Sequence, residues 1–192
     1  MRDRNDPRDI DVMFWLAAFA AASLFLLRFG YDFGVSDQDE FLPWLAHLLD
    51  PAVLSNDWFV RIQDASFNVR TVFVRSLVPL AELVGAEAAV HIVYVLSLTG
   101  ICLGIYRMGL ALYRGHPVLA AAGVILAVAV TARWNPAGND VAAAVLTPSM
   151  PAWAFTLNAV ATVLQDRLRT RTAVTAAVLI SIATAMQGLV GL

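Results

Sequence analysis

The chain has no lysine and one cysteine, and charged residues make up only 15% of its 192 positions. Because Cys102 is the only cysteine, the chain can form neither an intrachain disulfide nor a cluster of thiolate metal ligands, and Cys102 itself lies inside an apolar run. Thirteen arginines stand against fifteen acidic residues, which gives a net charge of −2. Nucleic-acid binding requires a basic surface, so the sequence predicts no nucleic-acid partner.

Apolar residues are abundant instead: they make up 59% of the chain, and the mean hydropathy is +0.69. This is not the composition of an ordinary soluble domain. A helix needs about 20 mostly apolar residues to cross roughly 30 Å of hydrocarbon. Five apolar segments predict helices of this kind: 12–29, 86–112, 117–132, 151–164, and 172 to the end. The fourth is short and could extend backwards through 141–146, with a break at Pro148 and Pro151.

We therefore expect an all-α, polytopic helical membrane protein with about five transmembrane helices. Residues 1–192 form a single membrane-embedded domain in this prediction, with a first span at 11–29, an exterior loop at 30–85 and further spans over 86–192. The partner of the apolar surface is membrane lipid. The chain stops within apolar sequence at 188–192, which favours the N-terminal portion of a longer protein over a last span that ends at the far face.

Arginines set the expected orientation. Residues 12–27 are not followed by a small-residue cleavage site, so a retained first span is expected rather than a signal peptide. On the side of the N-terminus the prediction places eight arginines: Arg2, Arg4, Arg8, Arg107, Arg114, Arg167, Arg169 and Arg171. The other side holds five: Arg28, Arg61, Arg70, Arg75 and Arg133. The excess predicts a multi-pass protein of the inner (cytoplasmic) membrane with a cytoplasmic N-terminus.

The exterior loop carries two apolar patterns with helical spacing, over 41–49 and 69–84. They predict amphipathic helices that lie along the membrane surface. Trp44 and Trp58 suit the interface between lipid and water.

Three carboxylates, Asp37, Asp39 and Glu40, follow the first span and are the catalytic candidates. In a helix that begins near Ser36, Asp37 and Glu40 share a face while Asp39 points elsewhere. A carboxylate there could act as general base or ligate a metal. Alternatively, Ser36 caps the helix and the acidic residues are simply solvated.

Four further polar residues are candidates for substrate binding. Asn56 and Asp57 could contact a polar ligand or cap a following helix. His91 could relay protons or hydrogen-bond between helices. Arg133 could bind phosphate through its forked guanidinium, with Asn139 or Asp140 also able to meet a phosphate or sugar, or it could anchor an ordinary interfacial loop. The histidines and acidic residues lack zinc-site spacing, so the sequence names no metal ligands.

The acidic loop resembles that of an uncharacterised bacterial family of polytopic proteins with a "DQ…LP…DP…ND.F" pattern. The matching segments are Ser36–Trp44, Leu49–Pro51, Asn56–Val60 and Asn68–Arg70. The layout as a whole is similar to the start of the C-type (GT-C-like) integral-membrane glycosyltransferase superfamily. Thr147-Pro-Ser149 resembles a further element of the family, but Gln187 stands where a histidine often lies.

The resemblance implies transfer of a sugar from a polyprenyl-phosphate donor at the exterior face. Asp37 or Asp39 would be the general base, Arg70 or Arg133 would steady the donor phosphate, and a divalent cation (Mg or Mn) could assist. Asp39-Glu40 matches the superfamily's acidic pair, whereas Asp37-Gln38 matches the uncharacterised family, so the base stays open between them. The alternative is a non-catalytic subunit of a cell-envelope polysaccharide or lipid assembly complex, with a membrane partner subunit. A transporter fragment is disfavoured by the scarcity of charge within the spans.

Overall fold

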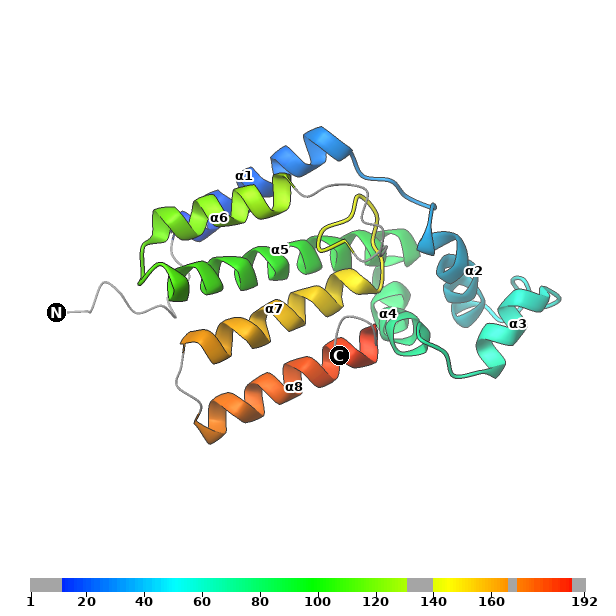
Figure 1. Ribbon diagram of the computed structural model, residues 1–192. Helices are drawn as coiled ribbons and strands as arrows, with labels where there is room; N and C mark the ends of the chain where they lie inside the picture. The colour runs from blue at the N-terminus through cyan, green and yellow to red at the C-terminus, as the bar shows by residue number, and fades with distance from the viewer. Residues whose placement is uncertain (1–11, 131–139, 166–168, 188–192) are drawn as a thin grey trace.

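The computed structural model describes residues 12–130, 140–165 and 169–187, and every regular element among them is a helix (Figure 1). The eight helices are α1 (Val12–Phe29), α2 (Asp37–Leu49), α3 (Trp58–Ala65), α4 (Thr71–Val84), α5 (Ala86–Leu112), α6 (Pro117–Ala129), α7 (Ser149–Gln165) and α8 (Thr170–Met186). The all-α prediction is confirmed for this part of the chain.

Five of the helices, α1, α5, α6, α7 and α8, form an elongated bundle with α5 at its centre (Figure 1). On one side, α5 packs against α6, which lies beside α1; on the other, it packs against α7, which lies beside α8. Arg28 near the end of α1 donates a hydrogen bond to the Ala129 carbonyl at the end of α6, over 3.0 Å. These two helix ends are thereby held together at the end of the bundle that carries the candidate site.

Two glycines of α5 allow its neighbours to approach closely. A Cβ atom on Gly104 would lie 2.6 Å from the Leu157 Cβ of α7, and one on Gly109 would lie 2.8 Å from the Ala120 Cα of α6. Small residues at such points let helix backbones come together, which is how helices gain packing energy in a lipid environment.

A polar cluster joins α5 to α7 near the other end of the bundle. The Arg107 guanidinium donates to Asn158 Oδ1 at 3.2 Å, to Thr162 Oγ1 at 3.3 Å and to Gln165 Oε1 at 2.9 Å. Gln165 Nε2 returns a hydrogen bond to the Arg107 carbonyl. The cluster requires the Arg107 side chain of α5 to meet three side chains of α7. It therefore fixes the register of the two helices as well as the distance between them.

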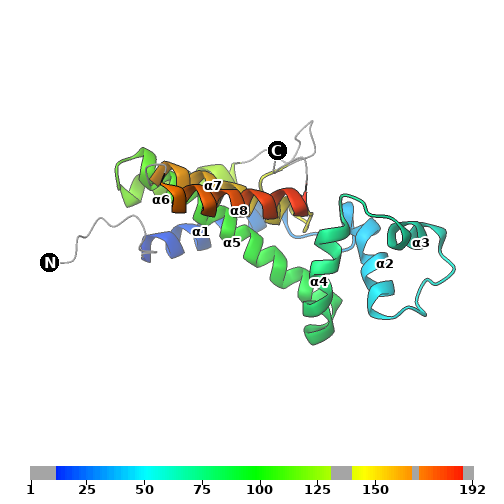
Figure 2. The same ribbon diagram turned by 90° about the horizontal axis from the view of Figure 1, so that it is seen from below.

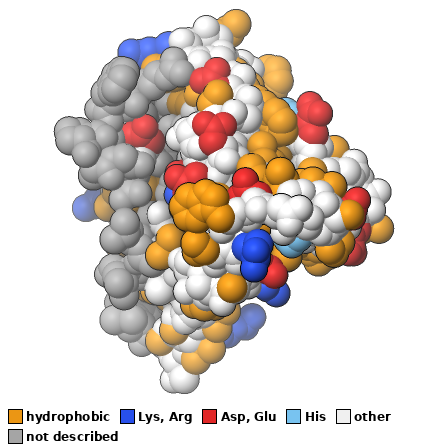
Figure 3. Space-filling model, turned by 90° about the vertical axis from the view of Figure 1, so that its right-hand side faces the viewer, with side chains coloured by type: hydrophobic (Ala, Val, Ile, Leu, Met, Phe, Trp, Pro, Cys, Tyr) orange, Lys and Arg blue, Asp and Glu red, His pale blue; other side chains and the backbone are white. Residues whose placement is uncertain are grey.

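Helices α2, α3 and α4 extend beyond one end of the bundle (Figure 2). Phe41 and Trp44 of α2 pack with Phe73 and Leu77 of α4, and all four are almost fully buried. Helix α4 leads directly into α5 through Gly85, whose φ of 88° is a conformation that glycine adopts without strain. Figure 3 views this end and shows hydrophobic side chains covering much of it, with acidic ones among them.

Most helix boundaries agree with the sequence prediction. Helices α1 and α5 have the predicted bounds, α7 begins two residues before the predicted position and α8 likewise, and the segment 141–146 is not helical. The last residues of the third and fifth predicted segments lie outside the described residues. The alternative in which the Ser36 side chain caps α2 is wrong, because Ser36 has a φ of 58° and its side chain makes no capping hydrogen bond.

Two helices of the described residues, α1 and α5, are long and apolar enough to cross a membrane, and α6 and α8 are apolar but shorter. The outer surface of α1 is strongly apolar: Phe19 is 75% exposed and Leu27 is 84% exposed. Length and composition thus single out two helices, fewer than the five spans expected from the sequence.

Candidate functional site

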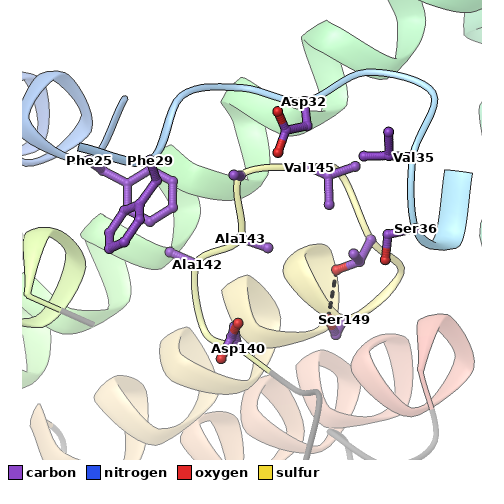
Figure 4. Close-up of a pocket in the computed structure, with 12 residues that line it drawn as sticks. Phe25, Phe29, Asp32, Val35, Ser36, Asp140, Ala142, Ala143, Val145 and Ser149 are labelled. Carbon is purple, nitrogen blue, oxygen red and sulfur yellow. Dashed lines mark hydrogen bonds between the residues drawn. The ribbon is translucent and has the colours of Figure 1, made fainter. Parts of the chain in front are cut away.

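A cavity of about 290 Å³ lies at the end of the bundle, where the linker between α1 and α2 meets the segment 140–148 (Figure 4). It is lined by Phe25, Phe29, Asp32, Val35, Ser36, Asp140, Ala142, Ala143, Ala144, Val145, Thr147 and Ser149. Its size is at the lower end of the range of roughly 300–1,000 Å³ that is typical of small-molecule sites.

The Gln38 side chain is fully buried and contacts both segments that line this cavity. Its Oε1 accepts a hydrogen bond from the Gly34 backbone N–H at 2.7 Å, and its Nε2 donates to the Leu146 carbonyl at 3.4 Å. The Asp32 backbone N–H donates to the Ala144 carbonyl at 2.7 Å. These bonds join the linker to the 140–148 segment, more than 100 residues further along the chain.

Helix α5 also contacts the 140–148 segment. The Tyr94 hydroxyl donates to the Ala143 carbonyl at 3.1 Å. At the start of α7, the hydroxyls of Thr147 and Ser149 are hydrogen-bonded to each other at 2.8 Å, and both residues line the cavity (Figure 4). The wall is therefore held in place by contacts with three different elements.

The polar lining consists of two carboxyl groups and three hydroxyls. Asp32 enters the cavity from the linker, whereas Asp140 enters from the far segment (Figure 4). Burial raises the pKa of the Asp140 carboxyl above its ordinary value of 3.8. A carboxylate with a raised pKa is a better general base near neutral pH than a fully solvated one.

Two of the predicted catalytic residues form a separate cluster with Arg70. One guanidinium nitrogen lies 3.3 Å from Asp37 Oδ1 and the other 2.5 Å from Glu40 Oε2. The Arg70 side chain is 23% exposed, and those of Asp37 and Glu40 are 34% and 45% exposed. The predicted shared face of Asp37 and Glu40 is thus confirmed, and Asp39 is exposed to solvent.

The other predicted binding residues are not brought into this cluster. Asp57 caps α3: its Oδ1 accepts hydrogen bonds from the backbone N–H groups of Phe59 at 2.9 Å and Val60 at 3.0 Å. The capping alternative for Asp57 is therefore confirmed, and the neighbouring Asn56 is exposed. Arg133 lies outside the described residues.

His91 lies in an aromatic cluster at the start of α5. Its ring stacks on Phe33, with centroids 5.5 Å apart, and contacts Tyr31 at 4.9 Å. Its Nδ1 donates to the Glu87 carbonyl one turn earlier, at 2.8 Å. The expected bond between helices is replaced by one within α5.

Sequence reasoning named Asp140, with Asn139, as a residue that could meet a phosphate or sugar, but it did not place Asp32 and Asp140 at one site. Each stands alone in its own segment, and only the pairing of the two segments places both at one cavity. Within the described residues, no group of three or more His, Cys, Asp or Glu side chains is placed to hold a metal ion. The divalent cation implied by the resemblance thus has no ready-made set of ligands in this part of the chain.

Comparison of the chain with models of protein families, with curated proteins and with solved structures finds no match.

Proposed function

We propose that the protein is a polytopic membrane protein of the glycosyltransferase-like type and that it transfers a sugar from a polyprenyl-phosphate donor at the exterior face. Helices α1, α5, α6, α7 and α8 cross the inner membrane in this proposal, with the N-terminus in the cytoplasm. The two membrane-length helices, the apolar surface of α1 and the excess of arginine at the other end of the bundle support this arrangement.

The observation that carries the proposal is the polar cavity at the exterior end of this bundle. Its lining includes two carboxyl groups and three hydroxyls, in a space bounded by the apolar side chains of Phe25 and Phe29. Sugar hydroxyls need hydrogen-bonding partners of this kind. A donor lipid also needs a site next to the hydrocarbon, and the end of α1 supplies that position.

In the proposed reaction, a hydroxyl oxygen of the acceptor attacks the anomeric carbon of the donor sugar. The bond between that carbon and the phosphate oxygen breaks, and polyprenyl phosphate leaves with the electron pair. The acceptor proton passes to a carboxylate. Asp140 fits this role because its pKa is raised by burial. Asp37 and Asp39, which the resemblance favours, lie outside the cavity lining, and Asp37 is paired with Arg70. No step of this reaction is assigned to a metal.

The test is a transfer assay in nanodiscs with synthetic undecaprenyl-phosphate hexoses and pentoses, following the release of undecaprenyl phosphate by mass spectrometry. We expect release with the wild-type protein, and a loss of about 100-fold or more for Asp140→Asn, as for removal of a general base. Glu82→Gln is the matched control, because Glu82 is exposed on α4 and lines no cavity described above. Full activity of Asp140→Asn would reject Asp140 as the base.

The same assay shows which carboxylate, Asp140, Asp37 or Asp39, acts as the general base. If Asp37→Asn or Asp39→Asn abolishes release while Asp140→Asn does not, the residues favoured by the resemblance carry the reaction. Absence of release with every donor tested, in protein that is folded and inserted, would contradict the transferase proposal.

The second candidate is a non-catalytic membrane subunit of a cell-envelope assembly complex. The observation that favours it is the Arg70 cluster, in which one arginine pairs with both Asp37 and Glu40 and links α2 to α4. Carboxylates that are held in ion pairs of this kind stabilise the packing of two helices. This alternative predicts that the native complex retains a stable partner subunit in mild detergent and that replacement of the cavity carboxylates leaves assembly intact.

A further inference from the structure

A groove of about 640 Å³ runs along the bundle between α5 and α8, with α7 beneath it. Helix α7 lies between the other two and packs along both, and α4 lies at one end (Figure 1). The groove is lined by Phe73, Ser76, Leu77, Val93, Leu96, Ser97, Gly100, Arg107, Pro151, Ala154, Phe155, Asn158, Thr162, Thr175, Leu179 and Met186.

The groove presents mainly hydrocarbon to an occupant, although several of its residues are polar. Asn158 Nδ2 donates to the carbonyls of Gly100 and Ala154, at 2.9 and 2.8 Å. Thr175 Oγ1 donates to the Arg171 carbonyl at 3.0 Å. These polar groups are satisfied by the helices themselves, so an apolar chain can lie against them without leaving them unpaired.

The groove is long enough for one lipid tail. On α5 its lining extends from Val93 to Arg107, which are 14 positions apart, or about 21 Å along the helix. One leaflet accounts for about half of the roughly 30 Å of hydrocarbon in a bilayer. A tail that enters at the Arg107 end would therefore be covered along its whole length.

The Arg107 end of the groove is basic. Arg107 itself lines the groove, and Arg114, Arg169 and Arg171 are exposed at the neighbouring helix ends. No aspartate or glutamate occurs among the described residues of α6, α7 and α8, or of α5 after Glu87. In the α7–α8 connection the sequence adds one acidic and one basic residue, Asp166 and Arg167. Among the described residues, this end therefore carries arginines and no acidic side chain next to an apolar groove.

We infer that the groove holds one acyl chain of an anionic glycerophospholipid from the cytoplasmic leaflet, whose phosphate is bound by the exposed Arg169 and Arg171 at this end. An apolar groove that ends in arginines matches a ligand with an apolar chain and an anionic head, because guanidinium groups bind phosphate oxygens in a forked geometry. The inference rests on the membrane orientation put forward in the proposed function. It concerns a different end of the bundle from the polar cavity and assigns this lipid no part in transfer.

The test is native mass spectrometry of the full chain in detergent, with added dioleoylphosphatidylglycerol or dioleoylphosphatidylcholine. The two probes have the same tails and differ in head-group charge. We expect the wild-type protein to retain the anionic lipid at least about fivefold better than the zwitterionic one, as two or more arginines near a phosphate would produce.

One matched pair of variants and one double variant test the groove and the arginines separately. Thr175→Trp fills the groove from α8 and should abolish retention of both lipids, whereas Val178→Trp, at an exposed position of α8 outside the groove, should behave as wild type. Arg169→Gln combined with Arg171→Gln should lower retention of the anionic lipid to that of the zwitterionic one. Both arginines are exposed, so this variant leaves the Arg107 cluster and the fold in place.

Equal retention of the two lipids by the wild-type protein would overturn the inference, and so would equal behaviour of Thr175→Trp and Val178→Trp. A wild-type dimer that Thr175→Trp converts to monomer would also overturn it, since a second copy would then occupy the groove. The readout is lipid retention and does not depend on sugar transfer. Loss of the transferase proposal would leave these results unchanged, and failure here would leave the Asp140 experiment unchanged.

Discussion

Gln38 and Leu146 are joined by a buried hydrogen bond from the side-chain amide to the backbone carbonyl, across 108 residues of sequence. The same amide group also accepts a hydrogen bond from the Gly34 N–H. A single side chain thus connects the α1–α2 linker, the start of α2 and the segment that carries Asp140. The relative position of the two segments that line the cavity depends in part on this contact.

Replacement of Gln38 by leucine should destabilise the protein by about 1–3 kcal/mol, because it leaves the Gly34 N–H and the Leu146 carbonyl without their partner. In a chain of this length 1 kcal/mol corresponds to roughly 2–4 °C in Tm. Thermal unfolding in detergent measures the effect. Asn56→Leu is the matched control, since it makes the same kind of change at an exposed site and should leave Tm nearly unchanged. Equal Tm values for the two variants would show that the amide contributes nothing.

Replacement of Asp57 by alanine should weaken the start of α3. The carboxylate accepts hydrogen bonds from the N–H groups of Phe59 and Val60, and loss of such a cap costs about 0.5–2 kcal/mol. Because α3 has eight residues, the cost should appear as faster amide hydrogen exchange of Phe59 and Val60. Asp57→Asn should preserve most of the protection, because asparagine is an equally good cap. Unchanged exchange in Asp57→Ala would contradict the capping role, and lost protection in both variants would assign importance to the charge.

The helices were predictable from the sequence because their signals are local. Apolar runs gave the bounds of α1 and α5, and Asp50-Pro51 indicated the end of α2 at Leu49. Helix α3 was anticipated only through the capping alternative for Asp57, since eight residues are too few to establish a period.

The cavity could not be predicted in the same way. Asp32 and Asp140 meet at one site only because backbone and amide contacts pair two segments that are far apart in sequence, and neither segment has a periodic pattern. The pairing of Arg70 with Asp37 and Glu40 has a similar origin. Spacing showed that the two acids share a face, but not that an arginine 33 residues after Asp37 lies opposite them.

Glycine-to-alanine substitutions in two helices should have opposite effects. A Cβ atom at position 104 would lie 2.6 Å from the Leu157 Cβ and 3.0 Å from its backbone carbon, so Gly104→Ala should force α5 and α7 apart and lower Tm. Gly123 in α6 has no atom within 4 Å of the equivalent position. Gly123→Ala should therefore leave Tm unchanged or raise it, because alanine favours the helix by up to about 1 kcal/mol relative to glycine. Thermal unfolding of both variants in the same detergent decides the matter. A Gly104→Ala protein as stable as Gly123→Ala would mean that α5 and α7 are not packed at this distance.

The partial burial of Asp140 should make stability depend on pH in a defined direction. Burial raises the pKa of this carboxyl in the folded protein above the ordinary 3.8 that it has when unfolded. Below 3.8 the group is protonated in both states and has no effect on the free energy of unfolding. As pH rises through the raised pKa, the folded state must hold a charge that burial disfavours, so this group lowers stability at higher pH. Asp140→Asn removes the charge, and its Tm relative to wild type should rise between pH 4 and pH 7. Asp39→Asn, at an exposed carboxylate, supplies the matched comparison. A difference between wild type and Asp140→Asn that stays constant over this range would show that the carboxyl is as well solvated as one on the surface, and would remove the electrostatic reason for assigning it the role of general base.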